Sequence, residues 1–218
     1  MKKNNRIRKY NNDVAKKDVE HLPAEKRIEL RGYRTYVGGR NAERWYSIGR
    51  LQYFFLVSQG LTAQHKFLDV GCGALRLGQY LIPFLDRGHY FGLEPEQLLV
   101  DCGLRHEIPE FIISQKQPTF THNYRFEFEA LDQFDFAMAN SIFTHLTPED
   151  ITLCFDNLHQ KTHPGSKFYF TFFRGNSTLN PDAASHANMR WEYTFSELQS
   201  FTDRWALDTS LPVLSGAI

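Results

Sequence analysis

The pattern of hydrophobic and polar positions along the chain alternates between strands and helices. Short apolar runs, which are typical of buried strands, cover residues 66–70, 89–94, 134–140 and 166–173. Apolar residues that recur every three to four positions predict helices over residues 43–60, 75–85, 96–107, 148–163 and 194–205. Weaker patterns predict strands near residues 119–122 and 206–214. We therefore expect a doubly wound α/β fold of three layers, with a mostly parallel sheet between two layers of helices.

Two segments flank or interrupt this alternation. Gly38 and Gly39 form a flexible break before the helix predicted over residues 43–60. That helix would pack through an apolar stripe made of Trp45, Ile48, Leu51 and Phe55. Residues 174–190 are polar and rich in turn formers, which at this length is typical either of a functional loop or of a mobile insertion.

The composition suits one domain with a basic extension. The 218 residues are 42% hydrophobic, enough for a single domain with a sizeable core. Residues 1–31 hold ten basic and five acidic side chains, so residues 1–35 are predicted to be a basic arm, partly disordered or helical, ahead of a domain over residues 36–218. Such arms are most often simply solvated. The net charge of zero gives no sign of a nucleic-acid surface.

The lack of a targeting signal and the spacing of the cysteines indicate the cellular compartment and the redox state of the thiols. The chain has neither the apolar stretch of a signal peptide nor one long enough to span a membrane, so we expect a cytoplasmic protein without a membrane partner. Its three cysteines include no Cys-x-x-Cys pair, which favours reduced thiols over disulfides or a zinc site. We also expect no catalytic metal, because no carboxylate cluster follows the strands.

The first predicted strand runs into a glycine loop, DVGCGALRLG, over residues 69–78. A nicotinamide or flavin fingerprint has a third small residue at the place that Arg76 occupies here. Asp69, at the strand end ahead of the loop, disfavours a pyrophosphate. An acid there suits the positively charged amino-acid and sulfonium part of S-adenosylmethionine. The charges thus favour the sulfonium cofactor.

Glu94 ends the second predicted strand, about 20 residues after the loop's second glycine. A carboxylate there can accept hydrogen bonds from both hydroxyls of a ribose. The separation between glycine and acid is also that of NAD enzymes, so it does not by itself identify the cofactor. Each acid also has a structural explanation when it is considered alone. Asp69 could cap the loop through its carboxylate, and Glu94 could be a solvated residue at a strand end. The order strand, acid, Gly-x-Gly, helix, strand, acid is more specific, and it predicts a nucleoside cofactor.

From these motifs the chain resembles the class I S-adenosylmethionine-dependent methyltransferase superfamily over about residues 43–210. FLDVGCGALRLG matches its first motif, YFGLE its acidic second-strand end, and FDFAMANSIFTHL its fourth-strand segment. The resemblance implies a Rossmann-like sheet of seven strands. We expect the C-terminal seventh strand to be missing, since few residues follow the predicted sixth. Tyr36 and the helix after it resemble the cap that family members fold over the cofactor.

The resemblance also implies roles for the loop residues. Gly71 and Gly73, with Cys72 between them, would lie against the methionine part of the cofactor. Asp69 would face its amino end, and Glu94 would hold the ribose.

Further positions follow from the same resemblance. Asn123, near the third strand end, would lie near adenine, and Asn140 and Ser141 would line the methyl-transfer cleft. Arg76 is a candidate for the cofactor carboxylate, although a surface salt bridge is the commoner fate of such a residue. These four positions complete the predicted cofactor site.

His145 is the candidate catalytic base. It follows the fourth predicted strand at the cofactor edge, in SIFTHL. A histidine that caps the loop or is satisfied in packing explains the position equally well. If the acceptor needs to lose a proton, we expect His145 to take it.

Three functions remain open at this point. The leading interpretation is an enzyme that moves a methyl group from S-adenosylmethionine to oxygen or nitrogen of a small-molecule acceptor. A non-catalytic S-adenosylmethionine-binding protein of the same fold is the second, and an NAD(P)-dependent oxidoreductase the third. Without a seventh strand, the sixth, in residues 206–214, would be an open sheet edge, so we expect either a homodimer that covers this edge or a native chain that extends beyond Ile218.

Overall fold

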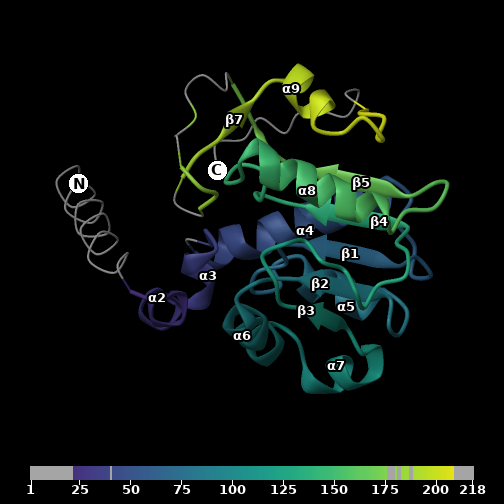
Figure 1. Ribbon diagram of the computed structural model, residues 1–218. Coiled ribbons are helices and arrows are strands. Elements are labelled where there is room, and N and C mark those ends of the chain that lie inside the picture. Colours follow the sequence, from purple (N-terminus) through teal and green to yellow (C-terminus); the bar gives the residue numbers. More distant parts are fainter. Residues whose placement is uncertain (1–21, 40, 176–179, 181–182, 187–188, 209–218) are drawn as a thin grey trace.

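A five-stranded parallel sheet forms the centre of the protein (Figure 1). The computed structural model describes residues 22–39, 41–175, 180, 183–186 and 189–208. The strand order is β3-β2-β1-β4-β5, and every neighbouring pair is parallel. The strands are β1 (Phe67–Val70), β2 (Tyr90–Leu93), β3 (Thr119–Thr121), β4 (Phe136–Ala139) and β5 (Lys167–Phe170). The chain reverses direction along the sheet between β1 and β4, which is where doubly wound sheets bind ligands.

Helices cover both faces of the sheet, as predicted. The face that carries Phe67, Tyr90 and Phe136 packs on four helices: α4 (Ala42–Ser58), α5 (Gly78–Phe84), α6 (Gln97–Glu107) and α7 (Glu110–Lys116). The opposite face, with Leu68 and Ala137, packs on α8 (Pro148–His159) and α9 (Phe195–Ser200). Successive strand residues point to opposite faces, and both faces are covered, which explains why the strands are continuous apolar runs.

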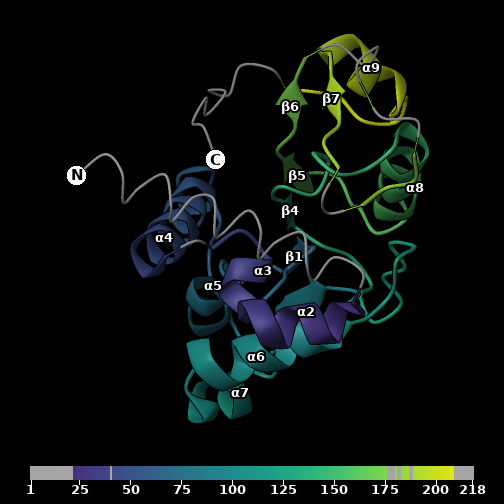
Figure 2. The ribbon, with the colours of Figure 1, turned by 90° about the vertical axis from the view of Figure 1, so that its left-hand side faces the viewer.

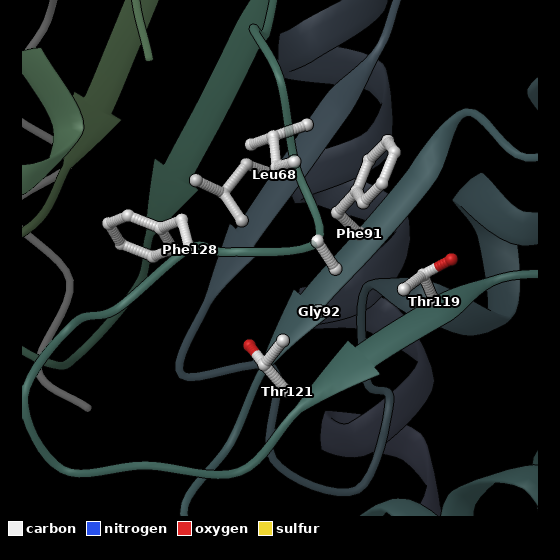
Figure 3. Close-up of a pocket in the computed structure, with 8 residues that line it drawn as sticks. Leu68, Phe91, Gly92, Thr119, Thr121 and Phe128 are labelled. Carbon is white, nitrogen blue, oxygen red and sulfur yellow. The ribbon is translucent and has the colours of Figure 1, made fainter. Parts of the chain in front are cut away.

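A loop rather than a helix connects β3 to β4. Residues 126–131 of this loop pack on the face of β1, β2 and β3, where Phe128 lines one small cavity together with Leu68 and Phe91 (Figure 3). The cavity left between them measures about 10 Å³, which has room for about one water molecule. A nucleoside cofactor therefore does not fit in this cavity.

The structure describes residues 174–175, 180, 183–186 and 189–190 of the predicted insertion. The insertion leaves β5 through the short strand β6 (Phe173–Arg174), which pairs in parallel with β7 (Glu192–Tyr193). In α9, which follows, the Thr194 hydroxyl accepts a hydrogen bond from Glu197 N, and the Glu197 carboxylate accepts one from Thr194 N. This capping box is the start signal that the sequence carries.

Several details of the predicted elements are wrong. The buried stripe of α4 is Trp45, Gly49, Gln52 and Leu56, whereas Leu51 is 52% exposed. The stripe contains a glycine because a Cβ at position 49 would overlap the backbone of Arg76. α5 begins three residues later than predicted, and α7 was not predicted. Residues 206–208 are not a strand, and the rest of the predicted sixth strand lies outside the described residues.

The N-terminal helices α2 (Ala24–Arg31) and α3 (Tyr33–Tyr36) lie at the end of the sheet where the glycine loop is (Figure 2). Ile28 of α2 is buried in a small cluster with Trp45, Ala74 and Leu99. Residues 24–37, which we call the α2–α3 segment, thus pack on the main domain. Residues 1–21 of the predicted basic arm lie outside the described part of the chain.

Arg34 forms an ion pair that links the α2–α3 segment to α6. Its guanidinium donates to both carboxylate oxygens of Glu107, from Nε at 2.6 Å and from Nη2 at 3.0 Å. The Tyr33 hydroxyl donates to the same carboxylate at 2.9 Å. The Glu107 side chain is only 1% exposed, so this is a largely desolvated ion pair.

Among the described residues, no helix combines the length and apolar character needed to cross a membrane.

Candidate functional site

The glycine loop after β1 turns back toward the end of β2. The N–H groups of Gly71 and Cys72 both donate to Leu93 O, at 2.8 and 3.0 Å. Gly71 and Gly73 have φ angles of 71° and 53°, the left-handed region that favours glycine. A Cβ at Gly71 would also overlap Ile142 Cδ1. These two positions therefore need glycine for local reasons.

Glu94 joins this loop to the end of β2. Its carboxylate accepts a hydrogen bond from Gly73 N at 3.0 Å and another from Glu96 N at 3.1 Å. The residue is 9% exposed, and burial raises the pKa of the carboxyl to about 7, although the two N–H donors oppose that rise. Each carboxylate oxygen has a second lone pair. Glu94 can therefore accept further hydroxyl donors without giving up its backbone partners.

Asp69 has a partner inside the protein. The hydroxyl of Tyr90 on β2 donates to its carboxylate at 2.7 Å. Asp69 is 4% exposed, and burial raises its pKa to about 7 while the Tyr90 hydrogen bond lowers it. No pattern in the sequence identifies Tyr90 as the partner of Asp69. Contact between Asp69 and the amino end of a cofactor stays a prediction.

Cys72 and Arg76 use their side chains within the protein. The Cys72 thiol lies in the apolar cluster between the sheet and α5, where burial raises its pKa. The Arg76 guanidinium donates to Val37 O at 2.5 Å and lies 4.8 Å from the centre of the Trp45 ring. Burial and the nearby charge of Arg44 lower the Arg76 pKa to about 10. Arg76 thus binds the α2–α3 segment to the glycine loop, and its Nε lacks a hydrogen-bond partner among the described residues.

The end of β3 contributes two residues that sequence reasoning missed. His122 Nδ1 lies 2.7 Å from Glu94 O, so that nitrogen carries the proton and donates. The Tyr124 hydroxyl donates to Glu96 Oε1 at 2.5 Å. Asn123 uses its amide in its own turn: Oδ1 accepts from Arg125 N and Glu127 N, and Nδ2 donates to Glu127 O. Its contact with adenine stays a prediction. Tyr124 and Glu96 belong to different segments of the chain, so no local sequence pattern could predict their contact.

Asn140 and Ser141 follow β4, as predicted. Asn140 Nδ2 donates to Ser141 Oγ at 3.1 Å. Ser141 has a φ of 60°, which is uncommon for a serine, and its N–H donates to Thr171 Oγ1 at 2.7 Å. The loop after β4 thus starts with a sharp turn that the chain after β5 holds in place. Strained turns of this kind cluster at functional sites.

His145 lies further along the same loop. Its Nδ1 is 2.6 Å from Met189 O. Because a carbonyl oxygen can only accept, Nδ1 carries the proton, and Nε2 of the neutral ring keeps its lone pair. This tautomer suits a base that acts through Nε2. It is equally compatible with a histidine that holds the insertion in place.

The insertion is attached along the whole of this loop. Residues 185–193 make hydrogen bonds to four successive residues, 144–147: Trp191 N to Thr144 O, His186 N to His145 O, Tyr193 Oη to Leu146 O, and Thr147 N to Ser185 Oγ. The described part of the insertion therefore borders the edge of the site next to β4.

Across the described part of the chain, no group of three His, Cys, Asp or Glu side chains is placed to hold a metal.

No known family model matches the chain. The structure is similar to an S-adenosylmethionine-dependent methyltransferase from Clostridium acetobutylicum, with 12% identity, 82% of this chain and 85% of that chain covered, and a TM-score of 0.53. It is also similar to magnesium protoporphyrin IX methyltransferase from Synechocystis with bound S-adenosylhomocysteine, with 14% identity, 81% and 87% coverage and a TM-score of 0.55. The match to the glycopeptide N-methyltransferase MtfA spans 58% of that chain and 61% of this one, at 14% identity and a TM-score of 0.49.

These likenesses, at low identity, concern the fold. The strand order and the two helical layers are those of the Rossmann-like sheet that the sequence predicts, so the predicted fold class is confirmed.

Proposed function

We propose that the protein binds S-adenosylmethionine at the carboxyl ends of β1, β2 and β4 and transfers its methyl group to oxygen or nitrogen of a small-molecule acceptor. The observation that carries the proposal is the Glu94 carboxylate. It is buried beside the glycine loop, hydrogen-bonded to Gly73 N, and still has open acceptor positions. An acid at this place fits two adjacent ribose hydroxyls and repels a phosphate.

The remaining residues fit the rest of such a cofactor. The glycine loop carries no side-chain atoms at Gly71 and Gly73, and Val37 of the α2–α3 segment lies over Gly73. That cover would exclude water from the site. The nicotinamide alternative is disfavoured because Arg76 stands where its fingerprint has a small residue, and Arg76 is already stacked on Trp45.

When bound, the cofactor supplies a methyl group already activated on a sulfonium. The protein then needs to align the acceptor and, for a hydroxyl or ammonium acceptor, to remove a proton. His145 Nε2 is the proposed base, since Met189 O fixes the proton on Nδ1. The insertion next to it would form part of the acceptor site, because it is hydrogen-bonded to residues 144–147.

The cofactor assignment is tested by calorimetric titration with S-adenosylhomocysteine. Glu94→Ala should bind about 10- to 100-fold more weakly, because each hydrogen bond to a charged acceptor is worth about 1.5–3 kcal/mol. Asp203→Ala, which removes an exposed acid, should bind like the wild type. Unchanged affinity in Glu94→Ala, or a rise in melting temperature with NADH and not with S-adenosylhomocysteine, would refute the assignment.

Catalysis is tested separately with His145→Ala and a panel of hydroxyl and amine acceptors. Turnover should fall by about 10²- to 10⁴-fold while affinity for S-adenosylhomocysteine stays the same. A variant that unfolds or loses the cofactor would show that His145 holds the insertion. A wild-type protein that binds the cofactor but methylates none of the panel would support the non-catalytic alternative.

A further inference from the structure

Arg190, in the insertion, is held in one position although it is exposed. Its guanidinium lies 4.2 Å from the centre of the Phe173 ring, and its Nη2 is 2.7 Å from Glu192 Oε1. The Arg190 side chain is nevertheless 64% exposed. Contacts of this kind stabilise an exposed side chain only slightly, whereas fixing a long side chain costs conformational entropy. Folding stability therefore does not account for the arrangement.

The backbone of Arg190 is fixed beside the proposed base. On one side, Met189 O accepts a hydrogen bond from His145 Nδ1 at 2.6 Å. On the other side, the N–H of the buried Trp191 donates to Thr144 O at 3.0 Å. Arg190 lies between these two bonds, so it is attached to the loop after β4 through both of its neighbours.

Glu192, the partner of the guanidinium, is itself held in place. Asn180 Nδ2 donates to Glu192 O at 2.9 Å, and Glu192 N donates to Asn180 Oδ1 at 2.7 Å. The Glu192 carboxylate packs over Gly175, where a Cβ would overlap its Oε2. Asn180 and Gly175 thus fix the carboxylate that directs Arg190.

The small β6–β7 sheet directs Arg190 away from the core. Phe173 and Glu192 are opposite each other in the strand register, so they share the face on which Arg190 is stacked. Tyr193, the next residue, points to the other face and is buried in the cluster with α8. Figure 2 shows β6 and β7 beyond the carboxyl end of β5. The Arg190 face is therefore at the same end of the sheet as the proposed cofactor site.

We infer that Arg190 binds a carboxylate group of the methyl acceptor, so that the acceptor is a small carboxylic acid carrying a hydroxyl or amine. The inference rests on the proposed function. A guanidinium has five N–H donors, and Glu192 contacts it at Nη2, which leaves donors for a second carboxylate. The charge of Glu192 disfavours the dianion of a phosphate ester at the same place. Glu192 acts as the positioning residue.

The test measures methyl transfer from S-adenosylmethionine to a panel of small hydroxy and amino acids, among them para-hydroxybenzoate and glycolate, each paired with its primary amide. The readout is the ratio of kcat/KM for the acid to kcat/KM for the amide. In the wild type this ratio should be about 10 or more. It should fall by about 10- to 100-fold in Arg190→Gln, because the hydrogen bonds to a charged group are lost.

Three further variants sharpen the comparison. Arg190→Lys keeps the charge without the forked donors and should keep part of the preference for acids. Glu192→Gln frees the guanidinium and should lower the ratio by less than Arg190→Gln does. Arg204→Gln, at another exposed ion pair, should keep the ratio of the wild type. S-adenosylhomocysteine should bind Arg190→Gln as it binds the wild type, which shows that the variant is folded.

The outcomes separate this inference from the proposed function. An unchanged ratio in Arg190→Gln, while transfer continues, would show that Arg190 only supports the insertion. A wild type that methylates amides as well as acids, or better, would also overturn the inference, and so would loss of S-adenosylhomocysteine binding in Arg190→Gln. A wild type that does not bind S-adenosylhomocysteine, or that methylates no member of the panel, overturns the proposed transfer and this inference with it.

Discussion

Ionisation of Glu94 should make the ligand-free protein less stable as the pH rises. Burial raises the pKa of this carboxyl from 4.5 to about 7. Below pH 4.5 the group is protonated in both the folded and the unfolded chain and contributes no pH dependence. Between pH 4.5 and 7 the unfolded chain ionises first, so the free energy of unfolding falls by about 1.4 kcal/mol per pH unit, about 3 kcal/mol in all. Above pH 7 both states are ionised and the loss is complete.

Urea unfolding of the wild type and of Glu94→Gln at pH 5 to 8 isolates this effect. Glutamine stays neutral at every pH, so the difference between the two proteins cancels most other titrating groups. The free energy of unfolding of Glu94→Gln relative to wild type should rise by about 2–3 kcal/mol from pH 5 to pH 8. Part of the rise comes through Asp69, because the charge of Glu94 raises the Asp69 pKa.

Glu129→Gln, at an exposed acid, serves as the control and should show no such trend. A difference between Glu94→Gln and wild type that is constant with pH, or that falls, would refute the reasoning. It would mean that water or a rearranged loop solvates the Glu94 carboxylate.

Two further predictions concern the α2–α3 segment and the glycine loop. Arg34→Ala leaves the Glu107 carboxylate buried without its cation, so amide hydrogen exchange in residues 24–37 should speed up by about tenfold or more, whereas Lys26→Ala, at an exposed pair, should change little. Gly71→Ala meets both a positive φ and Ile142, while Gly88→Ala meets a positive φ of 74° with no atom within 4 Å of its Cβ. Urea unfolding should therefore show Gly71→Ala to be less stable than Gly88→Ala by about 1–3 kcal/mol, and equal losses would exclude the clash with Ile142.

The strands could be predicted from the sequence because both faces of the sheet are buried. The residues of β1 and β4 are all buried, so β4 is apolar throughout and β1 is apolar apart from Asp69. The extent of α4 could also be predicted, but its buried face could not. Gly49 and Gln52 are on that face, and neither residue type carries a hydrophobic signal. Their burial depends on what packs against them, which the local pattern does not contain.

The candidate site divides in the same way. Gly71, Gly73 and Glu94 could be predicted, since their spacing follows from one strand, one turn and one helix. The partners of these residues could not. Tyr90 lies 21 residues from Asp69, and Tyr124 lies 28 residues from Glu96, and each pair meets only because two strands become neighbours in the sheet.

The residues proposed to bind the cofactor are also those that destabilise the ligand-free chain. Gly71 and Gly73 lose more conformational entropy on folding than other residues would, and a buried Glu94 opposes its own ionisation. Natural proteins keep such choices mainly where function needs them. Two ribose hydroxyls that donate to Glu94 would stabilise its ionised form and offset part of what burial costs. The same carboxylate accepts from Gly73 N, so a ligand that fixes Glu94 also fixes the loop beneath Val37. By linkage, packing of the α2–α3 segment on the loop then raises the affinity for the ligand, by the same free energy by which the ligand stabilises that packing.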